Sequence, residues 1–192
     1  GDLSSEGDTV EFSEIERFVT GSGDDTVDAS ATDNGVQVST GAGADSVLGG
    51  DGGDTLDAGA GDDTVNGGLG DDSITGGDGY DELQITDQFG DDTIIGGESG
   101  ETNGDKLAGG RLTEDVTVTF NNDGESGTVT NPGGDSAQFS EIEAVETGSG
   151  DDTIDASGSP VGVNVESGAG TDTITGGTGD DTVVSGLGND SL

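Results

Sequence analysis

Isolated aliphatic residues between polar neighbours recur along this chain at intervals of nine. Residues 40–84 divide into five nonapeptides with Val, Leu or Ile at the eighth place of each. Triplets such as Ser73-Ile74-Thr75 alternate polar and apolar residues, which predicts a short β-strand with one inward side chain. The glycine-rich segments between the triplets predict turns. The apolar residues that we expect to stack in the interior are Val27, Val47, Leu56, Val65, Ile74, Leu83 and Ile94.

Aspartate and glycine hold fixed places in these turns. In residues 40–84, glycine occupies the second and fourth places of every nonapeptide and aspartate the sixth. Similar units lie at 20–28, 87–95, 147–155, 167–175, 176–184 and 185–192, and residues 96–105 resemble a unit interrupted by an insertion. The place-six aspartates are Asp25, Asp45, Asp54, Asp63, Asp72, Asp81, Asp92, Asp152, Asp172, Asp181 and Asp190, and Asp105 ends the interrupted unit. The place-two and place-four glycines are Gly21, Gly23, Gly41, Gly43, Gly50, Gly52, Gly59, Gly61, Gly68, Gly70, Gly77, Gly79, Gly148, Gly150, Gly168, Gly170, Gly177 and Gly179.

A second, longer repeat is superposed on the nonapeptides. Shifted by 127 positions, residues 1–65 align with residues 128–192, and 32 of the 65 positions are identical. The chain therefore holds one complete 127-residue unit and about half of a second, as tandem duplication would produce. Because the pattern stops in mid-repeat, we expect the chain to be a piece of a longer protein.

Composition narrows the partners of such a chain. Apolar residues make up 26% of the sequence, and 43 acidic against 3 basic residues give a net charge of −40. This charge repels nucleic acids and anionic membrane surfaces, and no apolar run is long enough for insertion into a membrane. His and Cys are absent, so zinc, iron and copper lack their preferred ligands. Hard cations that bind oxygen remain as partners.

The nonapeptides resemble the RTX, or hemolysin-type, calcium-binding repeat, whose pattern is GGxGxDxUx. The resemblance implies an all-β fold, a right-handed parallel β-roll or β-solenoid in which two nonapeptides form one coil. On this basis we expect a calcium-free β lead-in at 1–19, a β-roll at 20–105, a calcium-free β segment at 106–146 and a second β-roll copy at 147–192.

Residues 106–146 contain three strand-like runs but no nonapeptide of this kind. These runs are expected to form either calcium-free coils of the roll or a hairpin laid against it, and a small separate β domain is a further alternative. Phe12, Phe120 and Phe139 lie in the stretches without nonapeptides and are expected to be core residues.

A coil of two nonapeptides brings residues 18 apart into neighbouring coils. Asp45, Asp63 and Asp81 would then line one edge of the roll. Asp54 and Asp72 would line the other. Coils lie about 4.8 Å apart, and two carboxylates at roughly 5 Å repel each other by about 3 kcal/mol at an effective dielectric constant near 20. A Ca²⁺ ion between the carboxylates turns this repulsion into coordination.

The metal ligands expected on this basis are the place-six aspartates, with carbonyl oxygens of the place-two and place-four glycines completing each shell. Together they would hold roughly five to eight Ca²⁺ ions. The half-coils at 29–38 and 156–165 lack the Gly-x-Asp turn and are expected to hold no ion. Folding should depend on the metal, and without it the chain should be a disordered acidic segment.

The resemblance also implies a function. It points to a calcium-binding structural module of a secreted or cell-surface bacterial protein, exported unfolded by type I secretion and folding in extracellular calcium. We expect no catalytic residues and no cofactor besides Ca²⁺. Repetition of the 127-residue unit favours an adhesin, matrix filament or surface layer in which copies of the chain associate. The alternative is the RTX segment of a secreted protease, lipase or epimerase whose catalytic domain lies outside this chain.

Overall fold

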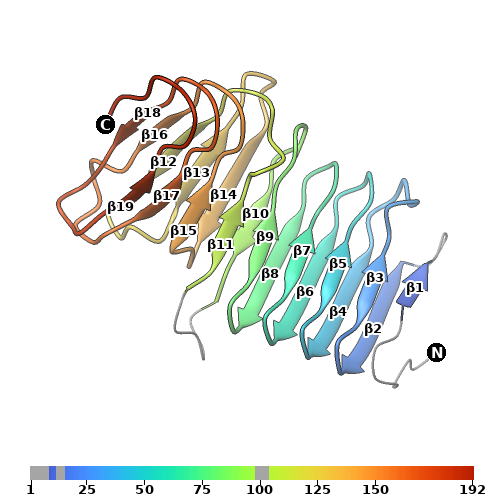
Figure 1. Cartoon of the computed structure of the whole chain (residues 1–192). Helices are drawn as coiled ribbons and strands as arrows, with labels where there is room; N and C mark the ends of the chain where they lie inside the picture. Colours follow the sequence, from blue (N-terminus) through green and yellow to red (C-terminus); the bar gives the residue numbers. More distant parts are fainter. Residues whose placement is uncertain (1–8, 12–15, 98–103) are drawn as a thin grey trace.

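The computed structural model describes residues 9–11, 16–97 and 104–192. These residues form strands and turns, and the described part of the chain contains no helix, hence none that could span a membrane. The strands belong to two sheets, A and B, and the chain passes from one sheet to the other at turns (Figure 1). The resulting β-solenoid of about eight coils is the fold class that the nonapeptides predict.

The two sheets take almost alternate strands of the chain. In the described residues, sheet A consists of nine parallel strands in the order β1 (Thr9–Glu11), β3 (Thr26–Asp28), β5 (Ser46–Leu48), β7 (Thr64–Asn66), β9 (Glu82–Gln84), β11 (Lys106–Ala108), β15 (Ala144–Glu146), β17 (Asn164–Glu166) and β19 (Thr182–Val184). Sheet B consists of ten, in the order β2 (Arg17–Ser22), β4 (Gln37–Ala42), β6 (Thr55–Ala60), β8 (Ser73–Asp78), β10 (Thr93–Ile95), β14 (Ser136–Ser140), β13 (Gly127–Thr130), β12 (Thr117–Phe120), β16 (Thr153–Asp155) and β18 (Thr173–Thr175). Among these sheet B strands, only β13 is antiparallel to its neighbours.

The core is a double column of aliphatic side chains between the sheets. In sheet A, Val27, Val47 and Val65 occupy successive coils in direct register, and sheet B carries an equivalent column. All seven residues predicted to stack inside are at most 2% exposed. Each such side chain contributes about 1.5–3 kcal/mol when fully buried. Because a coil supplies few of them, the turns decide whether the coils stay together.

The turns stack so closely that side chains are excluded from them. Gly61 has a φ of 134°, and a Cβ built on it would overlap the carbonyl oxygen of Gly43 in the preceding coil. Gly41 and Gly59 are crowded in the same way by the glycine one coil before them. The glycines predicted from the nonapeptide therefore have a steric role in the stacking of coils.

We expect Gly61→Ala to destabilise the folded chain through both its backbone conformation and this overlap. Positive φ at a residue with a side chain costs on the order of 1–3 kcal/mol, and the overlap adds to that cost. Gly134→Ala is the matched control, since Gly134 has a φ of 105° but no atom within 4 Å of an added Cβ. Urea denaturation in excess Ca²⁺ should show the larger loss for Gly61→Ala, and equal losses would rule out close stacking.

Residues 106–146 are built into the roll and form no separate domain. Strand β11 continues sheet A, while β12 and β14 lie parallel to the neighbouring sheet B strands and β13 returns between them. The two predicted alternatives, coils of the roll and a hairpin, are thus combined. Phe120 and Phe139 are buried as predicted, with ring centroids 5.5 Å apart. Phe12 and much of the predicted lead-in at 1–19 lie outside the described residues.

The coil that contains β12, β13, β14 and β15 is wider in sheet B than in sheet A. Sheet B contributes three strands to it, whereas sheet A contributes β15. Two additional strands widen sheet B by about 10 Å, and the stack changes direction here (Figure 1). On the outer face of sheet A, a hollow of about 320 Å³ is lined by residues that include Tyr80, Lys106 and Val184. Lys106 is paired there with Glu146 at 2.7 Å and with Glu166 at 3.6 Å.

Candidate metal sites

The place-six aspartates are buried despite their charge. Asp181 and Asp190, near the C-terminal end of the stack, are half-buried. The remaining ten are at most 4% exposed: Asp25, Asp45, Asp54, Asp63, Asp72, Asp81, Asp92, Asp105, Asp152 and Asp172. Burying a carboxylate is costly unless its charge is compensated. This row of aspartates therefore requires a physical explanation.

Eleven of these aspartates are linked into three ladders that run along the edges of the roll. At each step, the backbone N–H of one aspartate donates to Oδ1 of the aspartate in the next coil, at 2.7–3.1 Å. The ladders are Asp25–Asp45–Asp63–Asp81–Asp105, Asp54–Asp72–Asp92 and Asp152–Asp172–Asp190. The assignment of Asp45, Asp63 and Asp81 to one edge, and of Asp54 and Asp72 to another, is as the 18-residue spacing predicts.

The second carboxylate oxygen of several ladder members has no partner in the protein. Oδ2 of Asp45, Asp63, Asp72 and Asp81 is buried and accepts no hydrogen bond, and the same holds for Oδ2 of Asp152. Leaving a buried polar group unsatisfied costs about 1–3 kcal/mol, and more when it is charged. These oxygens lie where neighbouring coils meet, which suits a cation shared between coils.

Burial raises the pKa of four ladder carboxyl groups in the metal-free protein. The pKa is about 8 for Asp92, about 7 for Asp72 and about 6 for both Asp63 and Asp81, with burial the largest cause in each case. Neighbouring carboxylates add to the increase, as Asp81 and Asp45 do for Asp63. Protonation or a bound cation would each remove this penalty.

The metal-free chain should therefore gain β structure as the pH falls. Its folded-state pKa values of about 6 to 8 exceed the unfolded value of 3.8, so the folded state binds more protons. The resulting stability is fully present below about pH 4 and is lost as the pH rises through 6 to 8. Circular dichroism in EDTA from pH 8 to pH 4 measures this gain. A spectrum that does not change with pH would contradict the burial of the ladders.

Side chains alone do not complete a metal site. Among the described residues there is no group of three or more His, Cys, Asp or Glu side chains placed to hold a metal ion. Backbone carbonyl oxygens of the turns also lie close to these carboxylates, as Gly49 indicates. A Cβ on Gly49 would overlap both Oδ2 of Asp54 and the carbonyl oxygen of Gly67 in the next coil. Two carboxylates combined with carbonyl oxygens form the hard oxygen set that suits Ca²⁺.

Gly67 and Gly49 occupy place one of their nonapeptides, a place that is not among the predicted ligand positions. In several other units this place holds Ser or Thr, and Ser167 Oγ donates to Oδ2 of Asp172 at 2.6 Å. The predicted ligand role of the place-two and place-four carbonyl oxygens stays a prediction. The available signal for place one was the first glycine of the GGxGxD pattern.

Two of the ladders, and Asp181 outside them, border turns that lack the place-six aspartate. The N–H groups of Val36, Val116 and Val163 donate to Oδ1 of Asp54, Asp152 and Asp181, respectively, at 2.8–3.1 Å. The aspartate at each of these junctions meets a coil without a matching carboxylate. The absence of ions from the half-coils at 29–38 and 156–165 stays a prediction.

Glu143 extends the first ladder and was missed. Its Oε2 accepts the backbone N–H of Asp105 at 2.6 Å. At all the other ladder steps, the aspartate of the next coil accepts this N–H. Glu143 lies in the segment predicted to be calcium-free, because the segment contains no RTX nonapeptide. The duplication offered a signal, since Glu143 ends the FSEIE segment that recurs from residues 12–16.

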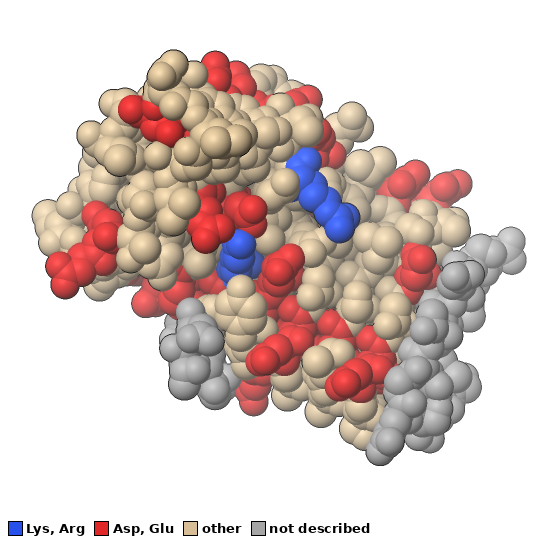
Figure 2. All heavy atoms as spheres, in the orientation of Figure 1, with Lys and Arg blue, Asp and Glu red and all other residues tan. Residues whose placement is uncertain are grey.

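The place-five aspartates also join neighbouring coils, although they lie on the surface. Asp24, Asp62 and Asp71 accept backbone N–H groups from the following coil at 2.9–3.1 Å. Figure 2 shows acidic side chains spread over the visible face, with few basic ones among them. These exposed carboxylates contact water, so they do not carry the burial cost of the ladders.

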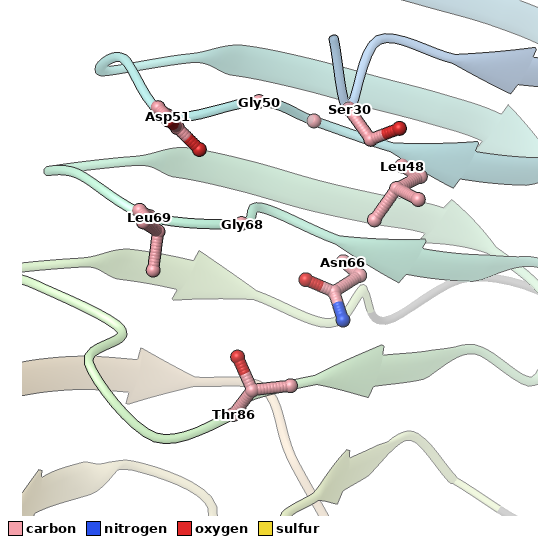
Figure 3. Close-up of a pocket in the computed structure, with 9 residues that line it drawn as sticks. Ser30, Leu48, Gly50, Asp51, Asn66, Gly68, Leu69 and Thr86 are labelled. Atoms are coloured by element: carbon pink, nitrogen blue, oxygen red, sulfur yellow. The ribbon is translucent and has the colours of Figure 1, made fainter. Parts of the chain in front are cut away.

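A second hollow, of about 240 Å³, lies beside the turns of the first half of the chain. Figure 3 shows Leu48, Asn66 and Thr86 around it, with Asp51 the one carboxylate among the labelled residues. One carboxylate is too few for a calcium site. The candidate sites are therefore those of the aspartate ladders.

The comparisons with known proteins agree with this geometry. The family model for the RTX calcium-binding nonapeptide repeat (4 copies) matches residues 13–36, 37–65, 48–83, 142–159 and 164–192. No curated protein matches the chain, and no solved structure does. The matched segments cover more than half of the chain. They contain nine of the eleven ladder aspartates, all but Asp92 and Asp105, and they also contain Asp181. The chain therefore belongs to the family of RTX calcium-binding nonapeptide repeats.

Proposed function

We propose that this chain is a structural module of a secreted or cell-surface protein and that Ca²⁺ ions between its coils hold it folded. The observation that carries the proposal is the set of buried ladder oxygens without a partner in the protein, on Asp45, Asp63, Asp72 and Asp81. A cation shared by two coils compensates both carboxylates and ties the coils together. Removal of the cation leaves the repulsion in place.

The same carboxylates make folding depend on location. Where Ca²⁺ is scarce, the net charge of −40 and the thin core favour the unfolded chain, which suits passage through an exporter. Where Ca²⁺ is abundant, the ion binds only the folded chain and so shifts the folding equilibrium towards the folded β-roll. We propose on these grounds that the module folds outside the cell and serves in an adhesin, filament or surface layer.

The ladders suggest a number of ions. The three ladders contain eight steps between neighbouring aspartates, and we propose one Ca²⁺ per step. Equilibrium dialysis against Ca²⁺, with native mass spectrometry of the complex, should therefore find close to eight bound ions per chain. Binding of only one or two ions, or equal binding of Mg²⁺, would contradict the proposal.

A further inference from the structure

The two copies of the 127-residue unit lie in the roll with their sheets exchanged. Strand β3 belongs to sheet A, whereas its equivalent β16 belongs to sheet B. Likewise, β4 in sheet B corresponds to β17 in sheet A, and β5 in sheet A to β18 in sheet B. Every equivalent pair of strands in the two copies shows this exchange.

The exchange follows from the number of half-coils in one unit. From β3 to β16 the chain crosses between the sheets eleven times, because β12, β13 and β14 all stay in sheet B. An odd number of crossings returns the chain to the opposite sheet. One unit therefore spans five and a half coils, and the hairpin accommodates three strands without adding a crossing.

We infer that the chain displays the surface of its duplicated segment twice, on opposite sides of the roll. Thr26 and Asp28 project from sheet A, and their equivalents Thr153 and Asp155 project from sheet B. The local structure is also repeated, since Asp28 accepts the N–H of Ser30 at 3.0 Å and Asp155 that of Ser157 at 2.9 Å. Both patches carry a carboxylate fixed beside exposed hydroxyl groups.

In a chain with further units, the patches alternate between the two sides, and the structural repeat is two units long. The bend at the hairpin alternates with them, so successive bends oppose each other and the array stays extended. The inference goes beyond the proposed function and depends on it only in requiring the calcium-loaded coil.

Cysteine pairs in the full chain, which has no native cysteine, test the sheet to which β16 belongs. Thr117 and Thr153 are register partners on β12 and β16. Neighbouring strands lie about 4.8 Å apart, within the Cα separation of a disulfide. Thr117→Cys/Thr153→Cys should therefore form a disulfide on mild oxidation in Ca²⁺, identified by peptide mapping. Lys106→Cys/Thr153→Cys should not, since it would link only if β16 stood in sheet A.

Thr153→Cys/Thr173→Cys is the control, because these residues are register partners within the second copy whichever sheet holds them. If this control and the 106/153 pair link while the 117/153 pair does not, the inference is overturned and calcium-dependent folding stands. The control linking alone also overturns the inference. If none of the three pairs links and Ca²⁺ leaves the dichroism unchanged, the proposed function fails together with the inference.

Discussion

Chelation of Ca²⁺ at pH 7.5 is expected to unfold the chain completely. If eight ions are bound at 100 times their dissociation constants, each contributes about 2.7 kcal/mol, together roughly 20 kcal/mol. Domains are typically stable by only about 5–15 kcal/mol. Loss of the ions therefore exceeds what the aliphatic columns can sustain. Circular dichroism should change from a β spectrum to that of an unfolded chain on addition of EDTA.

Refolding on addition of metal, and the choice of metal that restores the fold, complete this test. Excess Ca²⁺ should restore the β spectrum, whereas Mg²⁺ should not, since Mg²⁺ retains its waters and demands a tighter octahedral site. A β spectrum that persists in EDTA at neutral pH would show that the β-roll is stable without cations. Recovery with Mg²⁺ alone would show that charge screening, and no specific site, holds the coils.

Substitution Asp63→Asn is expected to have opposite effects with and without Ca²⁺. Asp63 takes part in two steps of the first ladder, with Asp45 and with Asp81. Asparagine keeps an oxygen that accepts the N–H of Asp45 but removes the charge, so two ion sites lose a carboxylate. The variant should bind about two ions fewer and need more Ca²⁺ to fold. In EDTA, its gain of β structure on acidification should begin at a higher pH than in the unchanged chain, because a penalty on the order of 1–3 kcal/mol is removed.

The neighbouring variant Asp62→Asn supplies the control. Asp62 is exposed and accepts the N–H of Tyr80 at 3.1 Å, which asparagine can also do. It carries the same change of charge one residue away from the ladder. Its Ca²⁺ stoichiometry and folding midpoint should match those of the unchanged chain. Equal losses in both variants would assign the effect to net charge and not to a buried site.

Much of the ladder arrangement could be predicted from the sequence because the period leaves little freedom. In a coil of two nonapeptides, residues 18 apart must be neighbours, and a step of 20 adds only two residues to a turn. This fixes the pairing of Asp45 with Asp63 and that of Asp72 with Asp92, as the structure has it. The inward aliphatic residues follow from the same period.

The remaining features depend on contacts that no local pattern encodes. Strand β13 pairs antiparallel with two sheet B strands, and only tertiary pairing decides that the hairpin joins the sheet. Glu143 reaches the ladder because β15 follows β11 directly in sheet A, across 38 residues of sequence from Asp105. Phe89, at place three of its nonapeptide, is 1% exposed, whereas Leu69, at place three of another nonapeptide, is 38% exposed. Gln88, with a φ of 66°, replaces the usual glycine of that turn.

The most direct test of a cation shared between buried carboxylates is crystallographic. Crystals grown in Ca²⁺ should give anomalous peaks between Asp45 and Asp63, and at the other ladder steps, with carboxylate and carbonyl oxygens at about 2.3–2.6 Å from each ion. Substitution of Tb³⁺ for Ca²⁺ should strengthen the same peaks. A map with the coils intact, no peaks along the ladders and the aspartate side chains turned towards solvent would contradict the account.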